Sequence, residues 1–199
     1  MGAFGTVLPV TGLNNGYLGQ VSRLGERVIT ARPAINIVGS TPIAFGAPVV
    51  IVPNATSGLG DTYQNIADYI AGGGAITSAN INARFAGVAN REVKTNVQFT
   101  SLFATNNATI NSYQPGEMTE ALERGSICVL LNNGFTPQSQ GPVFVRVAFN
   151  GAIPTGVIGG FEGVADGANT VQLTGVVFRT GLVDANHVAE ITILNRVAA

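Results

Sequence analysis

The chain has one histidine and one cysteine, which restricts the chemistry that its side chains could perform. A nucleophile–His–acid triad would have to use His187, yet the stretch Asp184-Ala-Asn-His187 is typical of a turn before a strand. No Gly-x-Ser-x-Gly elbow accompanies it. Cys128 stands in the apolar run Ile127-Cys-Val-Leu-Leu131, where we expect a small buried side chain, and one His with one Cys cannot complete a closed zinc shell. These residues predict neither a hydrolytic triad nor a metal centre.

Three glutamates form the only acidic cluster, at Glu117, Glu120 and Glu123. Paired carboxylates are the machinery of glycosidases, but a cluster of this kind is far more typical of an acidic surface turn, which is our interpretation. A phosphate-binding loop needs Gly-Lys-Ser/Thr after a strand, whereas Gly72-Gly-Gly74 follows a predicted helix. We therefore expect a protein that is not an enzyme and needs no cofactor.

The first half of the chain contains strand signals and one helix signal. Isoleucine, valine and phenylalanine recur over residues 28–52 between prolines, which favour the starts and edges of strands. One short helix is predicted near residues 61–71, because Asp61 can cap its start and apolar side chains fall on one face. Gly72-Gly-Gly74 can end that helix.

After Ile81 the strand signals return and continue to the C-terminus. Turn residues such as Asn150-Gly151, which suits a tight hairpin, separate apolar runs at intervals of about ten residues. The absence of helical periods between these runs points to antiparallel pairing. The pattern predicts a mainly β fold, an antiparallel barrel or sandwich, in a single domain over residues 28–199.

The N-terminal segment differs from the rest in its many glycines. Six glycines fall within residues 1–25 and no helix or strand period persists there. We interpret residues 1–27 as an extended arm whose spaced apolar side chains dock on a partner. The alternative is an edge segment that lies over its own domain. The candidate capsid or subunit interface consists of Phe4, Leu8, Leu13, Tyr17, Leu18 and Val21.

Charge is scarce along the whole chain. The 10 basic and 11 acidic residues make up 11% of it, whereas about a quarter is usual for soluble domains. We infer that much of the surface faces other protein, although Asn, Gln, Thr, Ser and Gly could also supply the polarity. With a net charge of −1 and a single lysine, the sequence has no basic stripe for nucleic acid. It shows no signal peptide and no membrane-spanning run.

An ordered set of short phrases resembles the bacteriophage structural cement family, also called capsid decoration proteins. The phrases are Ser40–Pro48, Arg84–Lys94, Tyr113–Glu117, Gly125–Leu131, Gly141–Val147, Gly159–Gly163 and Ala189–Leu194. The resemblance implies a β-rich protein that binds the outside of a virus head. It offers no catalytic residues to transfer to this chain.

The resemblance and the composition together suggest a non-enzymatic virion protein on the outer surface of the capsid. We expect it to bind the major capsid protein, to form a homodimer or homotrimer, and to bridge capsid subunits of the expanded head. It would be made in the host cytoplasm. The alternatives are a tail-tube or other virion β-barrel protein, and a displayed glycan- or host-surface-binding domain. The second is weakened by the absence of Trp and the presence of only four Tyr.

Overall fold

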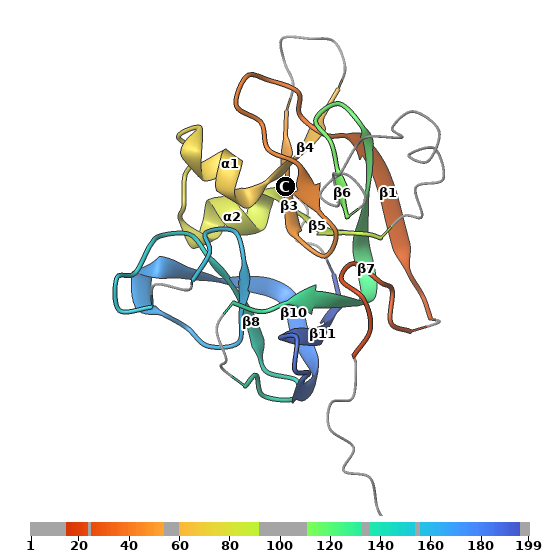
Figure 1. Ribbon diagram of the computed structural model, residues 1–199, viewed down its shortest axis with the longest axis vertical. Coiled ribbons are helices and arrows are strands. Elements are labelled where there is room, and N and C mark those ends of the chain that lie inside the picture. The colour runs from red at the N-terminus through yellow and green to blue at the C-terminus, as the bar shows by residue number, and fades with distance from the viewer. Residues whose placement is uncertain are drawn as a thin grey trace, which may run out of the picture.

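The computed structural model describes residues 15–23, 25–53, 60–91, 111–132, 136–153 and 156–195 (Figure 1). The fold is mostly β, as predicted, and its main feature is a curled antiparallel sheet of nine strands. The neighbouring strands in this sheet follow the order β4-β3-β5-β7-β11-β10-β8-β9, and β1 joins β7 separately. A second, small sheet pairs β2 with β6.

The elements follow one another along the chain with strands at both ends. The strands are β1 (Val28–Pro33), β2 (Ile43–Ala44), β3 (Pro48–Val52), β4 (Thr62–Asn65), β5 (Phe85–Ala89), β6 (Ser112–Tyr113), β7 (Met118–Leu130), β8 (Pro142–Arg146), β9 (Phe161–Glu162), β10 (Thr170–Val183) and β11 (Val188–Ile193). The helices are α1 (Ile66–Ala71), α2 (Ser78–Arg84) and the short 3-10 turn η1 (Gly167–Asn169).

The long strand β7 joins the two parts of the curled sheet, and Figure 1 shows it turning from the upper to the lower part of the molecule. In its first half, Leu122 pairs with Ile29 of β1 on one side and with Val88 of β5 on the other. In its second half, Ile127 pairs with Ile191 of β11. Residues of β7 therefore contribute to both buried apolar clusters of the protein.

Two parallel bridges bring distant parts of the curled sheet together. Ala34, which follows β1, bridges to Tyr63 of β4, and Leu131, which follows β7, bridges to Phe161 of β9. Tyr63 and Phe161 are almost completely buried, at 0% and 1% exposure. Burial of such aromatic side chains supplies a large share of the free energy that holds a β core together.

The predicted helix is present but begins later than expected. Residues Thr62–Asn65 form β4, paired with β3, and the cap is Asn65, whose side chain accepts a hydrogen bond from the Asp68 amide (2.7 Å). Asp61 does not cap the helix, and its carboxylate instead forms an ion pair with Arg32 (3.3 Å). The helix ends at Gly72, as predicted.

A second helix, α2, was not anticipated by the single-helix prediction. Thr77 caps its start by accepting a hydrogen bond from the Asn80 amide (3.3 Å). Its one large apolar side chain, Ile81, is fully buried, and Asn82 bonds to β10 through the Gln172 carbonyl (3.0 Å) and the Thr174 amide (2.7 Å). Figure 1 shows both helices gathered on one side of the sheet.

The Asn150-Gly151 turn is also present, with the Ile153 amide donating to the Asn150 carbonyl (2.9 Å). It does not join two strands of a tight hairpin. The preceding strand β8 ends at Arg146, and the next described strand is β9, which begins at Phe161. The turn therefore belongs to a longer connection between these strands.

Candidate assembly surface

Residues Asn15–Arg23, which we call the strap, lie against the second half of β7. The Gly19 amide donates to the Cys128 carbonyl (2.9 Å), the Cys128 amide to the Gln20 carbonyl (3.0 Å), and the Ser22 amide to the Ser126 carbonyl (3.0 Å). The described part of the predicted arm thus follows the alternative in which the segment lies over its own domain. Residues 1–14 lie outside the described residues, so an arm formed by them stays a prediction.

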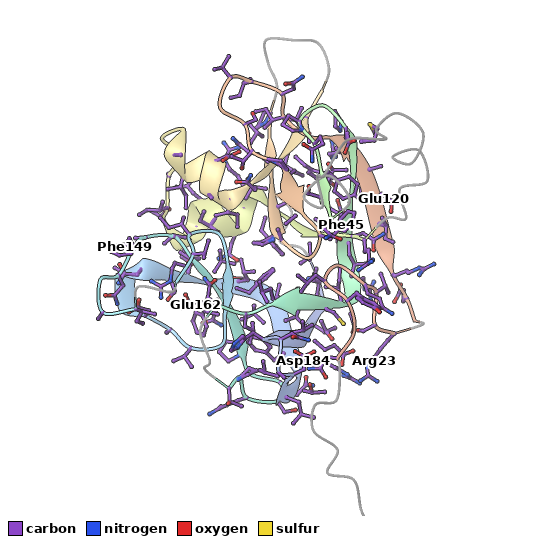
Figure 2. All side chains as sticks on the ribbon, in the orientation of Figure 1. Arg23, Phe45, Glu120, Phe149, Glu162 and Asp184 are labelled. Carbon is purple, nitrogen blue, oxygen red and sulfur yellow. The ribbon has the colours of Figure 1, made fainter. Side chains whose placement is uncertain are left out.

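Side-chain contacts with β11 and its preceding turn hold both ends of the strap (Figure 2). At one end, Arg23 Nε and Ser22 Oγ each donate to Glu190 Oε1 at 2.7 Å. At the other end, the Asn15 amide donates to Asp184 (3.1 Å) and the Asn15 side chain donates to the Val188 carbonyl (2.7 Å). The strap is therefore fixed at both ends to β11 and the turn that precedes it.

The Glu190 carboxylate carries much of this attachment. Its side chain is only 10% exposed, and burial by itself would raise its pKa. Hydrogen bonds from Arg23 and Ser22, together with the Arg23 charge, outweigh burial and hold the pKa of Glu190 below its ordinary value of 4.5. The carboxylate is consequently charged and paired at neutral pH.

The candidate interface residues fall into different environments. Tyr17 is 62% exposed, and the Arg91 guanidinium lies over its ring at 4.7 Å from the centroid. Leu18 is partly buried and lines a surface pocket, whereas Val21 packs against the core of its own domain. Phe4, Leu8 and Leu13 lie outside the described residues. Tyr17 is the most exposed of the three described members, and contact of any of them with another protein stays a prediction.

The pocket beside Leu18, which we call the apolar pocket, has a volume of about 340 Å³. Its walls come from the strap, the β2–β3 region, the start of α1, the end of β7 and the chain before β9. The lining residues are Leu18, Thr41, Pro42, Ala44, Phe45, Gly46, Ala47, Pro48, Asn65, Ile66, Ala67, Leu130, Asn132, Val157, Ile158, Gly159, Gly160 and Phe161. None of these side chains is charged.

A buried ion pair supports one wall of the apolar pocket. Arg146 of β8 is 0% exposed and its guanidinium donates to both carboxylate oxygens of Glu162 of β9, through Nε and through Nη2 (3.0 Å). Its Nη1 lies 2.9 Å from Asp166. Backbone bonds join Arg146 to Gly159 (2.8 Å) and Gly160 (3.0 Å), which line the pocket. The pKa of Arg146 is raised, chiefly by the hydrogen bond to Glu162, so the guanidinium stays charged despite burial.

Sequence reasoning missed this ion pair. Its partners are 16 residues apart in the chain and meet only because β8 and β9 are adjacent. The one available signal was an arginine inside the apolar run Val143–Val147, where the neighbouring side chains were expected to be buried. A charge at such a position requires a partner, but the sequence does not identify which acid supplies it.

The residues considered for catalysis do not converge. His187 is exposed in a turn with φ +60°, as predicted. The acidic cluster is not a surface turn, because Glu120 and Glu123 lie within β7 and are half-buried. Glu120 accepts a hydrogen bond from Asn90 (2.8 Å), and Glu117, just before the strand, accepts one from the Gln114 amide (2.7 Å). These carboxylates therefore take part in local structure.

Cys128 is 1% exposed, which agrees with the expected small buried side chain. Burial, followed by the nearby charges of Glu190 and Asp184, raises the pKa of this thiol to about 11. Within the described parts of the chain, no group of three or more His, Cys, Asp or Glu side chains could hold a metal ion. No helix among those parts is long and apolar enough to cross a membrane.

Comparisons with known proteins agree with this picture. The model of the family described as "Structural cement protein (E217 gp24/Pam3 gp6)" matches residues 9–194. The fold is similar to a chain in a solved structure titled "The capsid of Myoviridae Phage XM1", with a TM-score of 0.54 and 14% identity over 98% of this chain and 99% of that one. None of the curated proteins compared with the chain matches it. Because the family match covers nearly the whole sequence, the chain belongs to the phage structural cement protein family.

Proposed function

We propose that this protein binds the outer surface of a phage head and bridges neighbouring capsid subunits, which stabilises the expanded shell. The observation that carries the proposal is the family match over residues 9–194. The similarity in fold over the full length of a chain from a phage capsid structure is consistent with it. The proposed partners are the major capsid protein and further copies of this chain, as a homodimer or homotrimer.

The surface chemistry supports a role in assembly. Large apolar side chains with more than 40% exposure occur in many separate places: Tyr17, Val28, Ile37, Val38, Ile76, Met118, Leu130, Phe149, Val157, Val164, Leu182 and Leu194. Figure 2 shows one of them, Phe149, at the outer edge of the molecule. Such side chains can form several modest interfaces of ~1,000–2,000 Å² each, and their combined strength exceeds that of any single contact.

The proposal assigns no chemical reaction to the protein. His187 lies in a turn and Cys128 lies in the core. Glu117, before β7, and Glu120, within it, accept local hydrogen bonds. We propose a mechanical role instead, in which contacts across capsid subunit boundaries oppose their separation under the pressure of packaged DNA. The DNA itself is not a proposed partner, because the net charge of −1 gives no electrostatic attraction to phosphate.

Imaging the purified protein after addition to empty heads tests this function. We expect ordered density on the outside of expanded heads, across boundaries between capsid subunits. Unexpanded heads are the matched control, since their subunit boundaries differ and should bind less protein. Density confined to the tail, or tubes formed by the isolated protein, would instead support the tail-tube alternative. Absence of binding to either form of the head would contradict the proposal.

A further inference from the structure

We infer that two copies of this chain associate by reciprocal insertion, in which Ile37 and Val38 of each copy enter the apolar pocket of the other. We call these two residues the tip. The inference rests on the proposed function, since it names the contact between copies on the shell. It concerns self-association, however, and is tested separately from attachment to the head.

The tip presents two exposed apolar side chains. Val38 has 105% relative exposure and Ile37 has 59%. The loop is nevertheless ordered by its own bonds: the Ile37 amide donates to Ser40 Oγ (3.1 Å), and the Ser40 amide donates to the Ile37 carbonyl (3.0 Å). Gly39 supplies the positive φ of +90° that the turn needs. A turn fixed in this way loses little conformational entropy when it docks.

The apolar pocket has the chemistry to accept an aliphatic group. Its polar side chains already bond within the chain: Thr41 Oγ1 to Asp68 (3.0 Å), Asn65 Nδ2 to Thr41 (2.8 Å), and Asn132 Nδ2 to the Val157 carbonyl (2.8 Å). A polar ligand would therefore gain little from these groups. The volume of about 340 Å³ is at the small end of the range for ligand sites and suits a pair of branched aliphatic side chains.

The position of the tip relative to the pocket indicates that the occupant is a second copy. The loop that carries the tip continues directly into Thr41 and Pro42 on the pocket wall. Hydrogen bonds from the Thr41 amide (2.7 Å) and hydroxyl to Asp68 fix that wall to α1. The tip and the apolar pocket lie on neighbouring surfaces of one chain and have matching chemistry. Two copies related by a two-fold axis can therefore form the contact twice, with the tip of each copy in the pocket of the other. Such a contact closes on itself and leaves neither group exposed.

Sedimentation equilibrium of three variants tests this arrangement. Val38→Asp alters the tip, and Ala44→Trp, at an exposed position on the pocket wall, obstructs the cavity. We expect either change to weaken self-association at least ~100-fold, because a charge buried in the pocket or a blocked pocket affects both halves of the contact. Leu194→Asp is the control, since Leu194 is 55% exposed but belongs to neither group. It should associate like the original protein. Thermal melting of each variant verifies that it is folded.

A mixing experiment tests whether tip and pocket contact each other. Tagged Val38→Asp has an intact pocket and Ala44→Trp has an intact tip, so a mixed dimer keeps one of its two contacts. We expect the tagged variant to retain its untagged partner, although each variant associates with itself only weakly. Unchanged association of either folded variant, failure of the mixed pair, or a monomeric original protein at micromolar concentration would overturn the inference. The head-binding result would stand unaffected, because it is measured on the shell.

Discussion

Removing the carboxylate of Glu162 should destabilise the protein more than any comparable change at its surface. In Glu162→Ala, the guanidinium of Arg146, which is 0% exposed in the original protein, loses the hydrogen bonds from its Nε and Nη2. A buried ion that loses its partner typically costs ~3–5 kcal/mol in the free energy of unfolding. Asp166 still lies 2.9 Å from Nη1, so we expect a loss near the lower end, about 3 kcal/mol.

Urea denaturation followed by circular dichroism measures this loss. We expect a lower midpoint with an unchanged slope, since the slope reports the surface exposed on unfolding. Glu26→Ala is the matched control, because it also removes the glutamate of an Arg–Glu pair, with Arg124 (3.0 Å). The two side chains of that pair are 72% and 50% exposed, so its loss should cost less than about 1 kcal/mol. Similar losses for the two variants would refute the reasoning.

A double replacement distinguishes loss of a partner from loss of packing. Arg146→Met combined with Glu162→Leu removes both charges of the main pair and keeps an apolar volume between β8 and β9. Buried ion pairs replaced in this way are often as stable as the original. We therefore expect the double variant to recover much of the stability lost in Glu162→Ala. A double variant that is less stable than the single one would show that the ion pair supplies more than mutual neutralisation.

The strap and the composition lead to further predictions. Glu190→Gln should lower the melting temperature at pH 7, and the difference should shrink as the pH falls below 4.5 and through the lowered folded-state pKa of Glu190. Mass spectrometry should find Cys128 unreactive toward a thiol reagent at pH 7, because its pKa is about 11, and reactive after deletion of residues 1–25. Attachment to heads should change little between low and high salt, as monitored by sedimentation, because few charges are available to steer it.

The β class could be predicted because it depends on residue type along short stretches. The run Gly125–Leu131 is rich in branched and aliphatic side chains, and all of it except Leu131 forms the part of β7 that pairs with β11 and the strap. Burial of Cys128 follows from the same run. The end of α1 at Gly72 could also be predicted from the local sequence, since glycine disfavours continuation of a helix.

The helix boundaries could not be predicted in the same way. Thr62–Asn65 would suit a first helical turn, but these residues pair with Val49–Val52 and become β4. The second helix, α2, has the polar sequence Ser-Ala-Asn-Ile-Asn-Ala-Arg, which carries almost no apolar periodicity. Its position depends on Asn82, whose partners in β10 are about 90 residues away. Tertiary contacts therefore decided both cases against local preference.

Gly19 of the strap is explained by close packing of the backbone. The glycine-rich composition had instead suggested the conformational freedom of an extended arm. A Cβ on Gly19 would stand 2.8 Å from the Ala89 carbonyl oxygen and 2.9 Å from the Gly46 nitrogen, and its φ is +73°. Glycine is thus required there because two backbone segments approach closely. Composition alone does not separate this cause from the freedom of an extended arm, since both enrich glycine. The contact itself brings together residues far apart in the chain.

The few charges of this chain largely serve its own fold. Among the described residues, Arg23 pairs with Glu190, Arg32 with Asp61, Arg124 with Glu26, and Arg146 with Glu162 and Asp166. These pairs hold the strap, the β1–β4 region and the wall of the apolar pocket. Within each pair, the opposite charges cancel most of each other's electrostatic field. What the surface offers to another protein is then mainly apolar side chains and hydrogen-bonding groups, whose recognition depends on shape at short range. Such a surface favours a docked position on an assembled shell over long-range capture of a charged partner.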